Sequence, residues 1–192
     1  WTNYIKGVLW AFEKKEMVLP FGMDLLLLGD LPSGAGLSSS ASLEVLIGFI
    51  MRDLYGFDVT NVDLALIGQQ AEHEFCGVNC GIMDQFAVAM GKKDHALLLN
   101  TKTLDYEYIP ITLCGVKLII ANSNKKHKLG ESKYNERREE CETALEEISQ
   151  AIGIHALCDL DEKTWNLYQV MVKDDDRKRR VKHAVTENAR TK

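Results

Sequence analysis

Apolar residues recur every three or four positions over much of this chain, which is the spacing of amphipathic helices. In residues 1–15, for example, Val8 and Phe12 fall on one helical face. Thr60, followed three residues later by Asp63, is a typical helix start. We therefore expect helices over residues 1–15, 39–56, 60–75, 83–90 and 131–152, with two more between residues 162 and 191.

Four shorter segments have the pattern of strands instead. Gly22–Asp30 is a short apolar run bounded by glycines and by Pro20 and Pro32, which favours a buried strand over a helix. Three more strands are expected at residues 95–99, 104–109 and 116–121, the first two joined by a polar turn at residues 100–103. Helices and strands in this order indicate an α+β fold.

Charge and composition exclude several classes of partner. No run of eighteen apolar residues occurs, and the first residues lack the pattern of a secretory signal, so we expect a soluble, cytoplasmic protein without a membrane partner. The net charge is −5, and the basic run Arg177–Lys182 directly follows Asp174–Asp176. This alternation favours a solvated helix face over a nucleic-acid patch, so no nucleic acid partner is expected.

The five cysteines show no CxxC pair and no matching pair of histidines. They are therefore expected to be reduced thiols in a reducing compartment rather than disulfides or a zinc site.

The segment Gly34–Ser40 lies between the first expected strand and the second expected helix. Glycines let the backbone approach a ligand closely, and the free N–H groups at a helix start attract negative charge, so a phosphate group would fit here. A serine hydroxyl can also face a divalent cation. The simpler alternative is a serine-rich helix cap. A Walker loop is excluded because no lysine follows the last glycine.

Two carboxylates downstream could complete a kinase site. Glu72 lies beside the buried stripe of the third helix, and Asp84 lies in an apolar setting at the start of the fourth. Each alone is more typical of a structural residue. Together with a phosphate loop, however, a metal-binding carboxylate and a carboxylate facing an acceptor hydroxyl are the minimum set for phosphoryl transfer.

Three ordered motifs carry a family resemblance. Pro32–Ser42 resembles the central phosphate-binding motif of the GHMP small-molecule kinases, the galactokinases in particular, and Gln70–His73 and Gly81–Phe86 resemble the next two galactokinase motifs. The likeness runs over nearly the whole chain. It implies a GHMP-kinase fold, with the later part of a ribosomal protein S5 domain 2-like N-terminal domain at residues 1–113 and the beginning of the C-terminal domain at residues 114–192.

The resemblance also implies roles for individual residues. The ATP phosphates would be bound by Gly34, Ala35, Gly36, Leu37, Ser38, Ser39 and Ser40. Mg²⁺ would be held by Ser40 and Glu72, and Asp84 would be the catalytic carboxylate facing the anomeric hydroxyl. The sugar pocket would include Gly81, Asp84 and Tyr134, and the adenine would be bordered by Trp1 and Tyr4. Without the resemblance, Trp1 and Tyr4 would be ordinary helix packing and Tyr134 a surface aromatic residue.

The implied reaction is phosphorylation of D-galactose by ATP to galactose 1-phosphate. Two alternatives stay open: a kinase for N-acetylgalactosamine or another hexose, and a non-catalytic regulator that senses galactose and ATP. The presence of Asp84 favours the enzyme over the regulator. The galactokinase motifs that precede and follow these blocks are absent, so we expect the middle part of a longer kinase with little activity by itself. The sequence makes no prediction of oligomeric state.

Overall fold

The computed structural model describes residues 1–32, 34–122 and 133–191. The chain divides into two compact units, Trp1–Gly130 and Glu131–Lys192, and each is described by itself. The family domains expected at residues 1–113 and 114–192 stay a prediction, because compactness within this chain does not define a family boundary.

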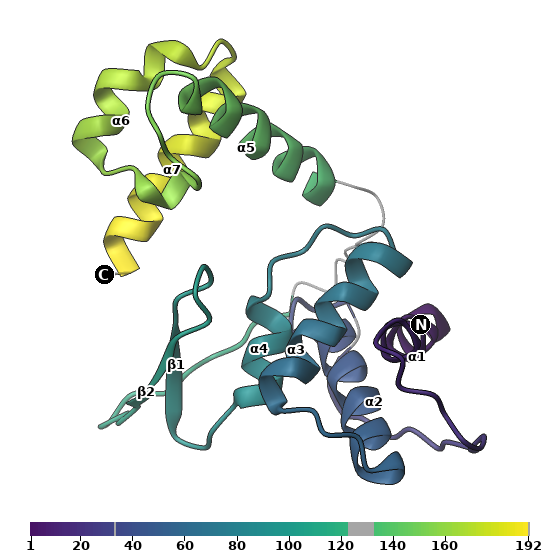
Figure 1. Cartoon of the computed structure of the whole chain (residues 1–192). Helices are drawn as coiled ribbons and strands as arrows, with labels where there is room; N and C mark the ends of the chain where they lie inside the picture. Colours follow the sequence, from purple (N-terminus) through teal and green to yellow (C-terminus); the bar gives the residue numbers. More distant parts are fainter. Residues whose placement is uncertain (33, 123–132, 192) are drawn as a thin grey trace. The chain divides into compact units, whose positions relative to one another are not determined.

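Four helices build the first unit and lie beside one another in Figure 1. They are α1 (Thr2–Lys14), α2 (Ser39–Tyr55), α3 (Asn61–Gln70) and α4 (Met83–Met90), and α3 continues as a single π-helical turn, η1 (Ala71–Phe75). These helices agree with the expected ranges. Their common core contains the fully buried side chains of Phe12, Ile47, Met51, Leu64 and Ile67.

Glycines at two helix crossings allow this close packing. A Cβ on Gly7 of α1 would lie 3.1 Å from the Cβ of Ala71, and a Cβ on Gly48 of α2 would lie 3.1 Å from Leu64 Cδ2. Both distances are shorter than an ordinary carbon–carbon contact, so a larger residue at either position would force the neighbouring atom to move.

The start of α3 has the cap that the sequence predicts. Asp63 N donates to Thr60 Oγ1 at 3.1 Å, and Thr60 N donates to Asp63 Oδ2 at 2.8 Å. These bonds satisfy two backbone donors at the helix start, and the bonds from Thr60 hold the pKa of Asp63 below its usual value.

Two strands form an antiparallel hairpin, β1 (His95–Leu99) and β2 (Tyr106–Pro110), with Leu97 opposite Tyr108. The first strand is confirmed as predicted. The second begins two residues later than expected because Leu104 has a positive φ of 63° and its N–H donates to Asn100 O at 2.8 Å, so Leu104 still belongs to the turn. The ring of Tyr106 packs edge-on against Phe86 of α4, with centroids 5.5 Å apart.

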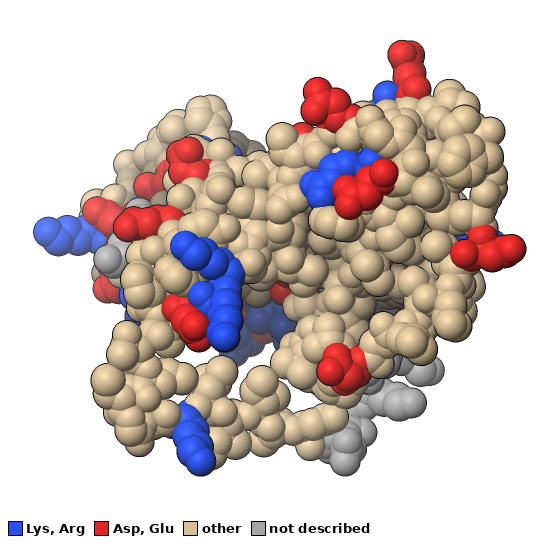
Figure 2. Space-filling view, turned by 90° about the horizontal axis from the view of Figure 1, so that it is seen from below, with Lys and Arg blue, Asp and Glu red and all other residues tan. Residues whose placement is uncertain are grey.

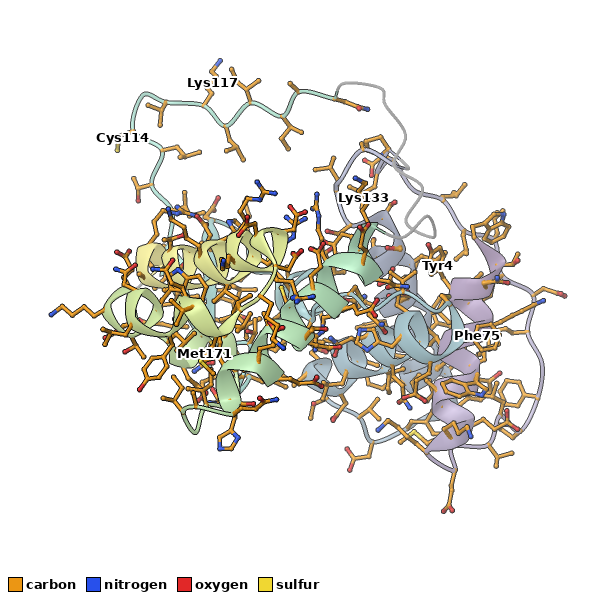
Figure 3. The ribbon with its side chains drawn as sticks, turned by 90° about the horizontal axis from the view of Figure 1, so that it is seen from above. Tyr4, Phe75, Cys114, Lys117, Lys133 and Met171 are labelled. Carbon is orange, nitrogen blue, oxygen red and sulfur yellow. The ribbon has the colours of Figure 1, made fainter. Side chains whose placement is uncertain are left out.

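The strands predicted at Gly22–Asp30 and at residues 116–121 are wrong for this structure. Both segments are irregular, and no described strand pairs with either of them. Leu26 and Leu28 are each 86% exposed and Ile119 is 85% exposed. Figure 3 shows the second segment, near Cys114 and Lys117, as an extended ribbon away from the helices. An apolar run becomes a strand only where a neighbour supplies the ladder of hydrogen bonds.

The second unit is helical, with α5 (Lys133–Ser149), α6 (Glu162–Tyr168) and α7 (Asp175–Thr191). Two 3₁₀ turns, η2 (Leu157–Asp159) and η3 (Gln169–Met171), flank α6. The helix expected from residue 131 is confirmed from Lys133 onward, and residues 131 and 132 lie outside the described residues. The buried core of this unit comprises Ala144, Ile148, Leu160, Trp165, Val172, Val181 and Val185.

The basic run on α7 is engaged with acidic residues of α5. Arg177 Nη2 lies 3.0 Å from Glu147 Oε1, and Arg180 Nε lies 2.6 Å from Glu140 Oε2. On the face shown in Figure 2, acidic and basic side chains are interspersed. The sequence predicted a solvated helix face, whereas Arg177 and Arg180 of this run pair with α5 and are largely covered by it. In the ranges that the structure covers, no helix is both long and apolar enough to cross a membrane.

Candidate active site

The loop before α2 has the backbone of an anion site. Gly34 and Gly36 both have a φ of 75°, and Ser38 has a φ of 54°. Alternation of positive and negative φ turns successive N–H groups toward a common side, the arrangement called a nest. None of the amide N–H groups of residues 34–38 donates a hydrogen bond to another described residue. They are therefore available to a ligand.

The simpler alternative, a serine helix cap, finds no support at the first turn of α2. Ser38 is the N-cap residue, yet its side chain makes no capping hydrogen bond. A left-handed conformation is also unusual for a serine at this position, because N-cap residues usually have an extended backbone. Such local strain is typical of functional sites.

Glu72 lies in η1 with only 4% of its side chain exposed. Its Oε2 accepts hydrogen bonds from Gln85 Nε2 at 2.7 Å and from Cys80 Sγ at 3.1 Å. The π-helical turn is closed by the bond from Cys76 N to Ala71 O at 3.0 Å. Single π turns inside helices are frequently found at functional sites.

A second buried carboxyl, Glu44 of α2, belongs to the same cluster and was missed from the sequence. It is 1% exposed, its Oε2 accepts from Gln85 Nε2 at 3.0 Å, and its Oε1 has no described partner. Burial, together with the nearby charge of Glu72, raises the pKa of Glu44 to about 8. A signal was available, because Glu44 lies three residues after Ala41, on the buried face of the helix.

Asp84 lies in the first turn of α4, next to the buried Gln85. The N-cap residue of α4 is Ile82, so Asp84 does not cap this helix. Its side chain is half-buried and makes no hydrogen bond or ion pair with another described residue. A carboxylate in this state is free to accept a proton or a hydrogen bond from a bound hydroxyl.

The loop that carries Gly81 is anchored at the preceding residue. The carbonyl oxygen of Cys80 accepts from Gln69 Nε2 at 3.3 Å and contacts His73 Nε2 at 2.6 Å. A carbonyl can only accept, so this contact requires the hydrogen to be on the Nε2 atom of His73. Gly81 itself is exposed, with open space where a Cβ would stand.

The aromatic residues expected in the site differ in their placement. Tyr4 is half-buried near the start of α1 (Figure 3), and burial, followed by the charge of Glu72, raises its pKa. It therefore lies within electrostatic reach of the carboxyl cluster. Trp1 is exposed just before α1. Tyr134 is exposed on α5, which belongs to the second unit, whereas the other candidate site residues belong to the first unit.

The two candidate metal ligands of the first unit, Ser40 and Glu72, offer the kind of oxygen atoms that Mg²⁺ prefers. A carboxylate and a hydroxyl are hard oxygen ligands, and Mg²⁺ usually takes one or two protein ligands together with phosphates and water. The described part of the chain contains no group of three or more His, Cys, Asp or Glu residues that could hold a metal. A cation bound by Glu72 and Ser40 would therefore need further ligands, such as phosphate oxygens or water.

Comparisons with known proteins show what the chain as a whole is similar to. Residues 3–92 match the sequence profile of the GHMP kinases N terminal domain. Over its whole length the chain is homologous to galactokinases. It is 49% identical over 191 residues to the galactokinase of Streptococcus suis and 50% identical over 191 residues to that of Clostridium beijerinckii, and covers 49% of each.

A solved structure supports the same assignment of the fold. The crystal structure of Lactococcus lactis galactokinase complexed with galactose matches all of this chain with a TM-score of 0.95 and 38% sequence identity. The match covers 49% of that protein. The α+β GHMP-kinase fold is thereby confirmed, and the chain spans about half the length of the galactokinases that it matches.

Proposed function

We propose that this chain is the phosphate-binding and catalytic-aspartate part of a galactokinase, which transfers the terminal phosphoryl group of ATP to the anomeric hydroxyl of D-galactose. The observation that carries the proposal is one compact unit that combines a loop of unpaired amides, the buried carboxylate of Glu72 and the unpartnered carboxylate of Asp84. The proposal is supported by the sequence identity between this chain and two galactokinases, which is 49% and 50% over 191 residues.

Each part of the site has a task in this reaction. The amides of Gly34–Ser38 and the N-terminus of α2 would bind the phosphates of ATP, because unpaired N–H groups there carry partial positive charge. Ser40 and Glu72 would hold Mg²⁺, which when bound offsets the negative charge of the phosphates. Asp84 would orient the sugar hydroxyl and accept its proton, and Gly81 would leave space for the sugar ring.

The remaining roles rest on the resemblance to galactokinases. Trp1 and Tyr4 would border the adenine, and Tyr134 would contact the sugar. The cytoplasm is the proposed location, since all five cysteines are free thiols, as expected in a reducing compartment.

The test is product formation by the full-length protein that contains this chain, assayed with ATP and a panel of hexoses that includes N-acetylgalactosamine. We expect galactose 1-phosphate from the unmodified protein. Asp84→Asn keeps the size of the side chain but removes its basicity, so kcat should fall about 10²-fold to 10⁴-fold while ATP binding changes less than about twofold. Asp58→Asn, at an exposed loop position, is the matched control.

Two other outcomes would change the proposal. Phosphorylation of a different hexose in preference to galactose would keep the kinase but replace its substrate. Binding of ATP and galactose without any phosphorylation would favour the non-catalytic regulator.

A further inference from the structure

One side chain, Gln85, connects the three parts of the candidate site. It is fully buried in α4, and its amide nitrogen donates both to Glu44 Oε2 at 3.0 Å and to Glu72 Oε2 at 2.7 Å. A primary amide has two N–H groups, so these two bonds use its full donor capacity. The two acceptors come from different elements, α2 and η1.

The two carboxyls bonded to Gln85 lie on elements that carry other candidate site residues. Glu44 follows Ser40 by four residues on α2, so the two side chains lie on the same helical face, one turn apart. Glu72 is the expected metal ligand of η1, and Gln85 directly follows Asp84 in α4. A single amide therefore holds together the elements that carry the phosphate loop, the metal carboxylate and the catalytic carboxylate.

A glycine in α3 provides the space for this contact. A Cβ on Gly68 would lie 3.1 Å from Gln85 Cγ and 3.3 Å from Glu44 Cβ. Glycine is unfavourable inside a helix, so its presence in α3 fits a need for room at this point.

The Glu72 carboxylate is constrained from a second direction as well. Cys80 Sγ donates to the same Oε2 atom at 3.1 Å, and Gln85 Nε2 lies 3.8 Å from that sulfur. With two donors on one oxygen, the carboxylate has a defined orientation before any cation binds. Hydrogen bonds of this kind commonly tune metal affinity.

We propose that Gln85 is a positioning residue for the kinase reaction: its amide orients the Glu72 carboxylate toward the cation and sets the position of α4, and hence of Asp84, relative to the phosphate loop. The inference rests on the proposed function for its effect on catalysis. Its effect on metal binding can be measured without any turnover.

The experiment uses the full-length protein and the variant Gln85→Met, which keeps the approximate length of the side chain but removes both hydrogen bonds. Affinity for Mn²⁺, as a probe for Mg²⁺, is measured calorimetrically in the presence of ADP, beside ADP binding without metal, kcat and the unfolding midpoint. We expect Mn²⁺ affinity and kcat each to fall about 10-fold to 100-fold. ADP binding without metal and the KM for galactose should stay within about twofold.

Two further variants make the result decisive. Gln169→Met loses one hydrogen bond, from Gln169 Nε2 to Asn166 O at an exposed position, and should behave like the unmodified protein. Gly68→Ala keeps the amide group of Gln85 but shifts its position by steric contact. It should therefore also weaken Mn²⁺ binding. If Gln85→Met does not fold, Gly68→Ala alone decides the question.

Unchanged Mn²⁺ affinity in folded Gln85→Met would overturn the proposal, as would unchanged affinity in Gly68→Ala if Gln85→Met does not fold. An unfolding midpoint lowered without any change in metal affinity would assign Gln85 a purely structural role, and so would also overturn it. If the unmodified protein phosphorylates no sugar, the proposed function fails, but the Mn²⁺ measurement still tests the positioning of Glu72.

Discussion

At the scale of single residues, the main feature of the first unit is a pair of buried carboxyls that share one amide donor. Glu44 is more deeply buried than Glu72, and one of its oxygens has no described partner. Removing water from a carboxyl disfavours its charged form, and a second carboxylate nearby adds to this effect. Both causes act in the same direction and raise the pKa of Glu44 to about 8.

This shift predicts that stability falls with rising pH. Below the ordinary pKa of 4.5 the carboxyl is protonated in both the folded and the unfolded state, so Glu44 does not make the free energy of unfolding depend on pH there. Between 4.5 and about 8 only the folded state holds the proton, and the free energy of unfolding decreases by up to about 1.4 kcal/mol per pH unit. Glu44→Gln should remove this dependence, which urea unfolding of the full-length protein at pH 5 to 8 would measure.

Glu13→Gln, at an exposed position of α1, is the control and should leave the pH slope unchanged. An equal slope in Glu44→Gln and the unmodified protein would show that Glu44 keeps an ordinary pKa in the fold.

At the scale of elements, the helices are specified largely by their ends. The capping box at Thr60 starts α3, and Gly56 in the left-handed conformation, with a φ of 70°, ends α2. Both signals act over a few residues and can therefore be recognised without knowing the tertiary structure. The π-helical turn η1 was not predicted, because its closing bond carries no sequence signal comparable to a cap.

The capping box gives a prediction for α3. Thr60→Ala removes the hydroxyl acceptor of the Asp63 N–H group and should lower the free energy of unfolding by about 1 kcal/mol. Chemical denaturation of the full-length protein would measure it. Thr60→Ser keeps the acceptor and should lie within about 0.5 kcal/mol of the unmodified protein. Equal losses in both variants would show that the threonine methyl group, rather than the hydroxyl, stabilises this helix start.

At the scale of the whole chain, two apolar segments, residues 22–30 and 116–121, pair with no described strand. Leu26 and Leu28 in the first segment, and Leu118 and Ile119 in the second, are all at least 80% exposed. Contiguous exposed apolar residues with strand-forming sequences favour association with other chains. In the first segment only Met23 and Leu27 pack against the core, and they are only partly buried, even though the composition of both segments is typical of buried strands.

The 192-residue chain by itself is therefore expected to self-associate. Light scattering should give an average mass above the monomer mass of 21.6 kDa that rises with concentration. The double variant Leu26→Ser, Leu28→Ser should reduce this mass, because it replaces the most exposed leucines with polar residues. Leu167→Ser, at an exposed position on α6 outside both segments, should not reduce it. A monomer at every concentration would contradict the expectation.

The sequence by itself determined the features that depend on near neighbours. Helix periodicity, the cap at Thr60, the hairpin beginning at His95 and the glycine-serine loop are all encoded within a few residues of one another. The candidate residues Glu72 and Asp84 could be named in advance because each lies in a short motif with a fixed spacing.

Only the tertiary structure decided which of these residues share an environment. Glu44, Glu72 and Gln85 are far apart in the chain, and their convergence on one amide requires α2, η1 and α4 to pack together around Gly68. The fate of the apolar segments at residues 22–30 and 116–121 was decided at the same level, because a strand requires hydrogen bonds to a neighbouring strand. Composition determines that a segment can pair, while the fold determines whether a partner lies beside it.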